Sequence, residues 1–450
     1  MYVRQSVDRQ RLREAIHAAV AAAPASPGGV VRAAVTVSGP EPMDWLAGLR
    51  AGDRTFWRSR AGALTVAAAG AAVSADVDDP LQLAPHIASL PAGAVAFVTG
   101  RFDAAAVPAS EWEPFGRVRL VLPRLERRDA PDMSTLACYI SHAERDDPDR
   151  VVDDCDRLAW PGLSSGDGQQ GPGLPVPAVR EGARRIDQPD YPAWESAVRH
   201  ALSAFDRGGL EKVVLARRSA WALPTSVGPI QALRAVVGRA PGCFQLLVER
   251  GDSAFLSITP ERLFRISRGR IVTEAVAATL PGDDPDADFG GKERREHALV
   301  VEDVLERLAP LVHDVEAGAE PRVMQLARRR HLHTRIAGNA RDGVSALDVL
   351  AALHPTPAVG GHPRETARDL IRASEGFDRG LYGGFVGRIG RDKEGRELAD
   401  FAVGIRSALL TPRDALLYAG AGIVPGSDPG SEWAEVDGKM SDLALALGLP

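Results

Sequence analysis

Cysteine is scarce in this sequence, and long apolar runs are missing from it. The three cysteines, at positions 138, 155 and 243, are too few and too far apart for a disulfide framework or a zinc ligand set. No stretch of about 18 apolar residues occurs that would predict a transmembrane helix. The alanine-rich segment 15–26 is faintly similar to a signal peptide, but Asp8, Glu14 and His17 interrupt the pattern. We therefore expect an amphipathic first helix and a cytoplasmic protein.

Positive charge is not in excess either. The chain carries 54 Lys+Arg residues against 60 Asp+Glu residues, which gives a formal net charge of -6. This balance argues against bulk electrostatic binding to nucleic acid or to an anionic membrane. The hydrophobic share of 45% and the charged share of 25% are those of ordinary globular proteins, so disorder is excluded as well.

Lysine is rare, because arginine supplies almost all of the positive charge. Only Lys212, Lys292, Lys393 and Lys439 occur among the 54 basic residues. Arginine stays protonated, whereas a buried lysine can lose its proton and act as a base. Each lysine is therefore a candidate for a specific role, except that Lys393 lies in a glycine-flanked segment typical of a hairpin tip.

The pattern along the chain predicts mixed helices and strands. Residues 1–150 alternate alanine-rich helical stretches with short strands such as 94–98 and 117–122, and the Gly- and Pro-rich segment 161–178 predicts a flexible linker. Beyond residue 212 strands dominate, with helices expected near 293–314, 345–353, 363–374 and 429–447. The absence of a regular βαβ period favours an α+β fold. We divide the chain into an N-terminal part (1–160), a linker or loop (161–180) and a C-terminal region (181–450).

Lys212 and Glu261 are the candidates for acid–base chemistry. Lys212 opens an apolar strand at 212–217, and the simpler interpretation is an edge lysine that reaches water. As a general base it would need burial or a neighbouring positive charge to lower its pKa. Glu261 follows Pro260 at a turn into a strand, where an ion pair with Arg262 is the alternative.

Three glutamates and a lysine are suited to a metal and carboxylate site. Glu296 shares a helix face with Val300, so it is expected to point inward from a charged first turn. Glu432, Glu435 and Lys439 occupy one face of a later helix at i, i+3 and i+7. Carboxylate oxygens are the ligands that Mg²⁺ prefers, although a solvated Glu–Lys face is an equally ordinary interpretation.

Two other motifs are judged to carry no function. The run Arg328–Arg330 with His331 and His333 is more typical of a solvated turn than of a nucleic-acid patch or a metal pair. The glycines at 420–426 are spaced G-x-G-x-x-x-G with Pro425 at the expected helix start, which excludes a dinucleotide-binding loop.

Taken in order, these motifs resemble the chorismate-utilising enzymes and, within them, the isochorismate synthases. The resemblance covers about residues 190–448, and the number and order of the motifs make it specific. The matching segments are 212–217 (KVVLAR), 259–264 (TPERLF), 292–297 (KERREH), 331–338 (HLHTRIAG), 353–361 (LHPTPAVGG), Tyr382, 402–407 (AVGIRS), 420–425 (GAGIVP) and 432–435 (EWAE).

The resemblance implies one large α+β domain of two packed antiparallel β-sheets with helices on the outside, to which the N-terminal part contributes strands. It implies Lys212 as the general base that activates water and Glu261 as the general acid for the departing C4 hydroxyl of chorismate. It further implies a Mg²⁺ site and a substrate-binding set. The metal residues are Glu296, Glu432 and Glu435, and the substrate-binding residues are Thr279, Tyr382, Arg406, Gly420, Gly422 and Lys439.

The resemblance also narrows the subfamily. Ala277 stands where some aminodeoxychorismate synthases carry a lysine nucleophile, and anthranilate synthases, which use ammonia, lack a base at the Lys212 position. Water is therefore the expected nucleophile, and we expect a monomer without a glutamine amidotransferase subunit. Residues 354–358 resemble isochorismate synthases more than salicylate synthases, and residues 44–46 with 56–60 resemble menaquinone-pathway rather than siderophore-pathway members.

Three positions depart from the family pattern. Ala278 replaces a glycine, Gly282 a common arginine and Arg388 a frequent tryptophan, and the stretch 280–291 is short. Two alternatives stay open beside isochorismate synthase, the second of them because of these departures. One is a salicylate synthase, which also eliminates pyruvate, and the other is a non-catalytic descendant that binds chorismate-like diacids.

Overall fold

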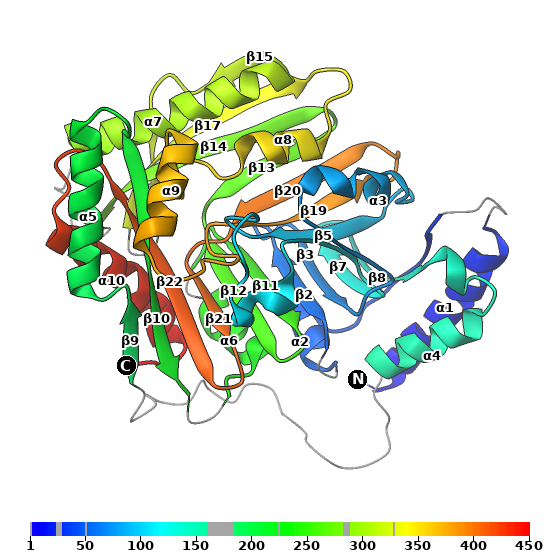
Figure 1. Ribbon diagram of the computed structural model, residues 1–450. Helices are drawn as coiled ribbons and strands as arrows, with labels where there is room; N and C mark the ends of the chain where they lie inside the picture. Colours follow the sequence, from blue (N-terminus) through cyan, green and yellow to red (C-terminus); the bar gives the residue numbers. More distant parts are fainter. Residues whose placement is uncertain are drawn as a thin grey trace.

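The computed structural model describes residues 2–23, 29–49, 52–159, 184–223, 226–238, 240–281, 289–326 and 329–450. Within these ranges the chain forms two large antiparallel β-sheets with helices packed on their outer faces (Figure 1). The predicted α+β class with two packed sheets is therefore confirmed. The expected linker at 161–180 and the departure at Gly282 lie outside the described residues.

The first sheet has 12 strands among the described residues, and β9 pairs with β10 beside the main path. Its main order is β1 (Val31–Thr36), β8 (Met133–Ile140), β7 (Leu125–Ala130), β3 (Thr65–Ala69), β2 (Arg54–Arg58), β11 (Phe244–Arg250), β12 (Ser253–Thr259), β21 (Ser407–Leu410), β22 (Asp414–Ile423), β10 (Lys212–Ala222) and β18 (Gly361–His362), with β9 at Arg185–Gln188.

The second sheet has 10 strands in the same described ranges, and β16 pairs with β17 beside the main path. Its main order is β15 (Val312–Ala317), β17 (Arg329–Ala340), β14 (Arg270–Pro281), β13 (Arg262–Ser267), β20 (Glu397–Val403), β19 (Phe385–Arg391), β5 (Val95–Gly100), β6 (Val118–Leu122) and β4 (Val73–Val77), with β16 at Arg322–Gln325. Strands β1 to β8 are divided between the two sheets, so the first 160 residues contribute to both.

The helices flank these sheets, and two of them begin at an aspartate whose side chain caps the helix. Asp190 accepts a hydrogen bond from the Ala193 amide at 3.1 Å at the start of α5, and Asp428 accepts one from the Ser431 amide at 2.8 Å at the start of α10. The α-helices are α1 (Tyr2–Ala21), α2 (Pro42–Ala47), α3 (Ala84–Ala88), α4 (Pro148–Ala159), α5 (Tyr191–Asp206), α6 (Pro229–Val237), α7 (Gly291–Leu308), α8 (Ala346–Leu353), α9 (Arg364–Ser374) and α10 (Pro429–Ala446).

The predicted helices occur, but α7 ends earlier than the pattern at 293–314 indicated. It stops at Leu308, and the chain passes through a short 3₁₀ turn into strand β15 at Val312. Pro310 explains the difference, because proline has no amide hydrogen with which to continue the helix. No helix in the described part of the chain is long and apolar enough to cross a membrane.

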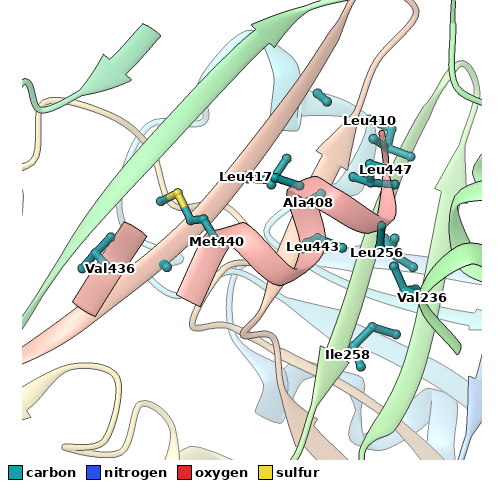
Figure 2. Close-up of a cluster of buried hydrophobic side chains, with 14 of the residues drawn as sticks. Val236, Leu256, Ile258, Ala408, Leu410, Leu417, Val436, Met440, Leu443 and Leu447 are labelled. Carbon is teal, nitrogen blue, oxygen red and sulfur yellow. The ribbon is translucent and has the colours of Figure 1, made fainter. Parts of the chain in front are cut away.

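Apolar side chains between the sheets and on their outer faces hold the sheets and helices together. Between the sheets, Trp57 and Phe244 of the first sheet pack with Val386 of the second. On the outer face of the first sheet, Met440 and Leu443 of α10 lie among buried aliphatic side chains of β12, β21 and β22 (Figure 2). Each large side chain that is fully buried in this way contributes about 1.5–3 kcal/mol to folding. This packing fixes the position of α10, whose other face carries the predicted site residues.

Two neighbouring pairs of strands cross from one sheet to the other at the same place. Strand β12 ends in the first sheet at Thr259 and β13 begins in the second at Arg262, while β20 and β21 make the reverse crossing between Val403 and Ser407. The crossings are hydrogen-bonded to each other, since the Val403 amide donates to the Glu261 carbonyl at 3.1 Å. Glu261 lies in one crossing and Arg406 in the other.

Candidate active site

The predicted site residues come together although they lie on distant segments. All of them except Lys212 line one cavity of about 110 Å³. Lys212 lies behind the cavity wall, in contact with one of the lining carboxylates. The lining members of the predicted set are Glu261, Thr279, Glu296, Tyr382, Arg406, Gly420, Gly422, Glu432, Glu435 and Lys439.

Lys212 is fully buried, so the interpretation as an edge lysine that reaches water is wrong. Strand β10 has neighbours on both sides, β22 and β18, which leaves no open edge at this residue. The Lys212 Nζ atom lies 3.1 Å from Glu296 Oε1 on α7. A Cβ atom on Gly422 would come within 2.3 Å of that same carboxylate oxygen, so a side chain there would displace the Glu296 carboxylate from its present position.

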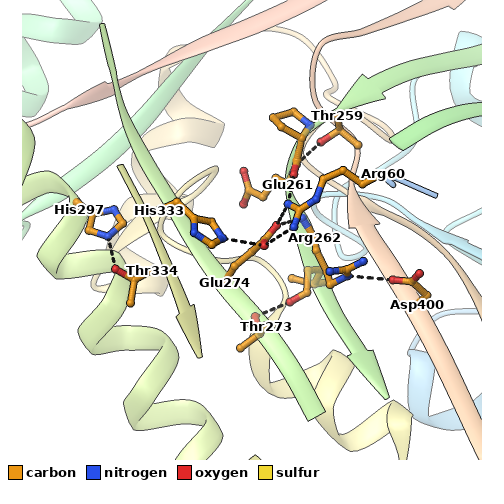
Figure 3. Close-up of polar contacts among 12 residues, drawn as sticks. Arg60, Thr259, Glu261, Arg262, Thr273, Glu274, His297, His333, Thr334 and Asp400 are labelled. Atoms are coloured by element: carbon orange, nitrogen blue, oxygen red, sulfur yellow. Dashed lines mark hydrogen bonds and ion pairs between the residues drawn. The ribbon is translucent and has the colours of Figure 1, made fainter. Parts of the chain in front are cut away.

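Glu261 is a buried carboxyl group with a strongly perturbed acidity. Burial, reinforced by the nearby carboxylate of Glu274, raises the pKa of Glu261 to about 8, although Lys212 and Arg406 act in the opposite direction. At neutral pH the group is therefore protonated and can donate a proton. The alternative ion pair with Arg262 is wrong, because Arg262 Nε instead donates to Asp400 Oδ1 at 3.1 Å (Figure 3).

Each of the three predicted metal carboxylates has a lysine partner. Beside the Lys212–Glu296 pair, Lys292 Nζ lies 2.8 Å from Glu432 Oε1, and Lys439 Nζ lies 2.7 Å from Glu435 Oε1. Three of the four lysines in the sequence therefore lie at this site, whereas Lys393 is exposed at the turn between β19 and β20. Among the described residues, no group of three or more His, Cys, Asp or Glu side chains is arranged to hold a metal ion.

Arg406 is oriented by His331, a residue to which the sequence analysis gave no role. The Arg406 Nη2 atom lies 2.7 Å from His331 Nε2, and His331 Nδ1 lies 3.2 Å from the Ala278 carbonyl. Burial, together with Arg406 and Lys439, holds the pKa of His331 well below its usual range. The ring is therefore neutral, with Nδ1 donating to the carbonyl and Nε2 accepting from arginine.

The interpretation of residues 328–333 as a solvated turn is consequently wrong for the described residues 329–333, which belong to β17. His331 is 6% exposed and lines the cavity. The match of residues 331–338 to the family pattern could have indicated a role for His331. The basic run before it instead favoured a solvated turn. Arg328 lies outside the described residues.

Tyr382 closes another side of the cavity. It is buried and stacks on Tyr418, with ring centroids 5.7 Å apart and an interplanar angle of 18°. Burial raises the pKa of its hydroxyl, which therefore stays a hydrogen-bond donor at neutral pH. A Cβ atom on Gly420 would lie 2.8 Å from the Tyr382 oxygen, so the glycine leaves that hydroxyl room beside the cavity.

Ala278 adopts a backbone conformation that favours glycine. Its φ angle is +60°, at a bulge where the pairing of β14 with β17 shifts between Ala277 and Thr279. The bulge places Thr279 Oγ1 3.3 Å from His331 Nδ1. The departure at Arg388 lies elsewhere, buried near the Trp57 ring and outside the cavity lining.

The two-sheet α+β fold surrounds one cavity lined by acid, amine and carboxylate groups, an arrangement typical of proteins that bind small polar molecules. The chain belongs to the chorismate-binding enzymes, since the model of the family described as "Chorismate binding enzyme" matches residues 15–448. The predicted family is therefore confirmed.

Two similar proteins are named as isochorismate synthases. The salicylate biosynthesis isochorismate synthase of Pseudomonas aeruginosa is 41% identical over 263 residues, covering 56% of this chain and 54% of that protein. The chloroplastic isochorismate synthase 2 of Arabidopsis thaliana is 34% identical over 370 residues, covering 77% and 63% respectively. The matches thus span between half and two thirds of the length of these relatives.

A solved structure matches nearly the whole chain. It is that of MenF, the menaquinone-specific isochorismate synthase from Escherichia coli, with a TM-score of 0.82 and 26% identity. The match covers 97% of this chain and 99% of that one. The fold described above is therefore similar to that of this isochorismate synthase over nearly the whole chain.

The acidity of Glu261 makes a prediction about stability. Its pKa rises from an ordinary 4.5 to about 8 on folding, so its stabilising contribution is complete below pH about 4.5 and is lost as pH rises through about 8. Between pH 5 and 8 the free energy of unfolding should fall more steeply in the wild type than in Glu261→Gln, by more than about 1 kcal/mol. Urea denaturation at pH 5, 6.5 and 8 measures the difference, and parallel pH dependences would contradict it.

The strain at Ala278 makes a second prediction. Ala278→Gly should raise the free energy of unfolding by about 0.5–1 kcal/mol, because glycine adopts a positive φ without steric cost. Ala277→Gly, at the neighbouring residue with an ordinary φ, should lower it by a similar amount. Thermal and urea unfolding of both variants provide the comparison, and destabilisation of both alike would refute the assignment of strain.

Proposed function

We propose that this protein is an isochorismate synthase, which isomerises chorismate to isochorismate by adding water at C2 and removing the C4 hydroxyl. The observation that supports this function best is the combination of a protonated, buried Glu261 in the crossing between β12 and β13 with a buried Lys212 on β10, whose charge acts on the Glu261 carboxyl. A reaction that both adds and removes water needs a base and an acid in one site. The isochorismate synthases among the relatives support the same assignment.

In the proposed reaction, Lys212 leaves its ion pair with Glu296 and acts in its neutral form. It takes a proton from water as the water oxygen bonds to C2 of the ring. Glu261 donates its proton to the C4 hydroxyl, which leaves as water while the ring double bonds shift. Return of the proton from Lys212 to Glu261 restores both groups, so the net change is an isomerisation. General acid and base groups of this kind typically contribute about 10²–10⁴-fold each to the rate.

The substrate of this reaction carries two carboxylates, and the cavity offers matching donors. Arg406, oriented by His331, and the hydroxyls of Tyr382 and Thr279 are the proposed donors on one side. Lys439, whose Nζ donates to the Gly420 carbonyl at 2.8 Å, is the proposed donor near the glycine strand. Backbone amides at Gly420 and Gly422 complete the proposed set, because these residues have no side chain to block the approach.

Mg²⁺ is the proposed cofactor, held by Glu296, Glu432 and Glu435. The donor chemistry fits, because three carboxylates from α7 and α10 line one cavity and Mg²⁺ prefers such oxygens. Each carboxylate is neutralised by a lysine in this structure, so a bound cation would replace lysine contacts. When bound, Mg²⁺ would neutralise a carboxylate of the substrate.

The proposed setting is menaquinone biosynthesis, in the cytoplasm, by a monomer without a glutaminase subunit. The motif at 56–60 supports the pathway, as does the structural match to a menaquinone-specific enzyme over almost the full chain. Siderophore biosynthesis is the second candidate pathway, since the Pseudomonas aeruginosa relative is named for salicylate biosynthesis.

The function is tested by incubating chorismate with the pure protein and separating the products by chromatography. We expect isochorismate without pyruvate from the wild type and at least a 100-fold loss of rate in Lys212→Met. Lys393→Met is the matched control, because this lysine is exposed at a hairpin turn, and it should retain the full rate. Salicylate with pyruvate would reassign the protein to the salicylate synthases, and binding of unchanged chorismate would identify a non-catalytic descendant.

The metal is tested by titrating Mg²⁺ into the same assay after treatment with a chelator. Turnover should depend on Mg²⁺, and Glu432→Gln should raise the concentration that gives half-maximal rate by at least about tenfold. Glu302→Gln is the control, since Glu302 lies on the exposed face of α7. Full turnover in the presence of chelator would refute the proposed cofactor.

A further inference from the structure

A second buried carboxylate, Glu274 on β14, lies beneath the general acid. It is 6% exposed and accepts hydrogen bonds from three sides (Figure 3). Arg60 donates to both of its oxygens, with Nη1 at 2.5 Å and Nη2 at 3.0 Å. The Arg262 amide donates at 2.8 Å, and His333 Nε2 lies at 3.0 Å.

These donors keep Glu274 ionised. Although burial opposes the charged form, the hydrogen bonds from His333, Arg60 and the Arg262 amide hold the pKa of Glu274 below its ordinary value. An ionised carboxylate only accepts hydrogen bonds, so His333 Nε2 carries the proton that it shares with Glu274. A fixed negative charge therefore lies close to Glu261.

The same contacts fix the backbone on both sides of Glu261. The Arg262 amide, immediately after Glu261, donates directly to Glu274. Arg60 Nη1 also donates to the Pro260 carbonyl, immediately before Glu261, at 2.8 Å. Glu274 thus holds the crossing between β12 and β13 in two ways. It binds the Arg262 amide after Glu261 directly, and it holds the Pro260 carbonyl before Glu261 through Arg60.

We propose that Glu274 is a positioning residue for the general acid: it fixes the turn that carries Glu261 and holds a negative charge beside that carboxyl group. This inference rests on the acid role proposed above for Glu261. The groups that act on Glu261 are Glu274, which favours the protonated form, and Lys212, Arg406 and the Thr356 hydroxyl, which favour the ionised form. Removing the charge of Glu274 leaves burial alone to oppose the second set, so Glu261 ionises at lower pH.

The test is the pH profile of kcat/KM for chorismate in Glu274→Gln, which preserves shape and removes the charge. The alkaline limb should move to lower pH by about one unit or more, with activity retained below that limb. Glu249→Gln is the matched control, because Glu249 is similarly buried and accepts hydrogen bonds from Nε and Nη2 of Arg54, each at 3.0 Å, yet it lies on β11. Its alkaline limb should not move. A uniform loss of rate in Glu274→Gln with an unmoved limb would overturn the proposal.

A second variant separates charge from position. Glu274→Asp keeps the charge but withdraws it from the Arg262 amide by one methylene group. Its alkaline limb should stay near that of the wild type while kcat falls, and wild-type kcat in this variant would overturn the positioning role.

A spectroscopic measurement makes the inference independent of turnover. The infrared carbonyl band of protonated Glu261, identified by its loss in Glu261→Gln, should titrate at lower pH in Glu274→Gln than in the wild type. A shifted band in a protein that does not convert chorismate would refute the proposed function alone. An unshifted band in an active isochorismate synthase would refute the role of Glu274 alone.

Discussion

The constraint on which this structure depends is the paired crossing of strands between its two sheets. Strands β12 and β21 are neighbours in the first sheet, and their continuations β13 and β20 are neighbours in the second. The short connections therefore meet at one place in the interior, where their backbones are hydrogen-bonded to each other. Glu261 lies on one connection and Arg406 on the other. Burial of polar groups at such a seam is costly unless each group finds a partner, and this requirement shapes the site.

Three of the four lysines form ion pairs with glutamates of the cavity. A buried ammonium group without a partner costs several kcal/mol, and so does a buried carboxylate. Lys212, Lys292 and Lys439 each face one glutamate of the cavity, so every pair is neutral within the protein. Such pairs bring little net stability, because desolvation offsets the attraction. They hold three carboxylates at one small cavity, with two of the amines lining it and the third in contact with Glu296.

The N-terminal part of the chain takes a direct part in this arrangement. Arg60 follows β2 and reaches Glu274, which lies 214 residues further along the chain. Through Glu274 and the Pro260 carbonyl it supports the segment on which Glu261 lies. The β-sheet that begins in the first 160 residues is therefore part of the environment that sets the acidity of the Glu261 carboxyl, as well as part of the scaffold.

The sequence by itself determined the α+β class, the family and ten residues of the cavity lining, because these rest on local patterns and on motifs in a fixed order. Pro260 marks the turn before Glu261, and Asp428 and Pro429 mark the start of the helix that carries Glu432 and Glu435. The burial of Lys212, the neutral state of His331 and the pairing of Arg60 with Glu274 were decided only by the tertiary structure. The reason is physical. Periodicity along a strand tells which residues share a face, but the partner across a sheet, and the burial that shifts a pKa, depend on register between segments hundreds of residues apart.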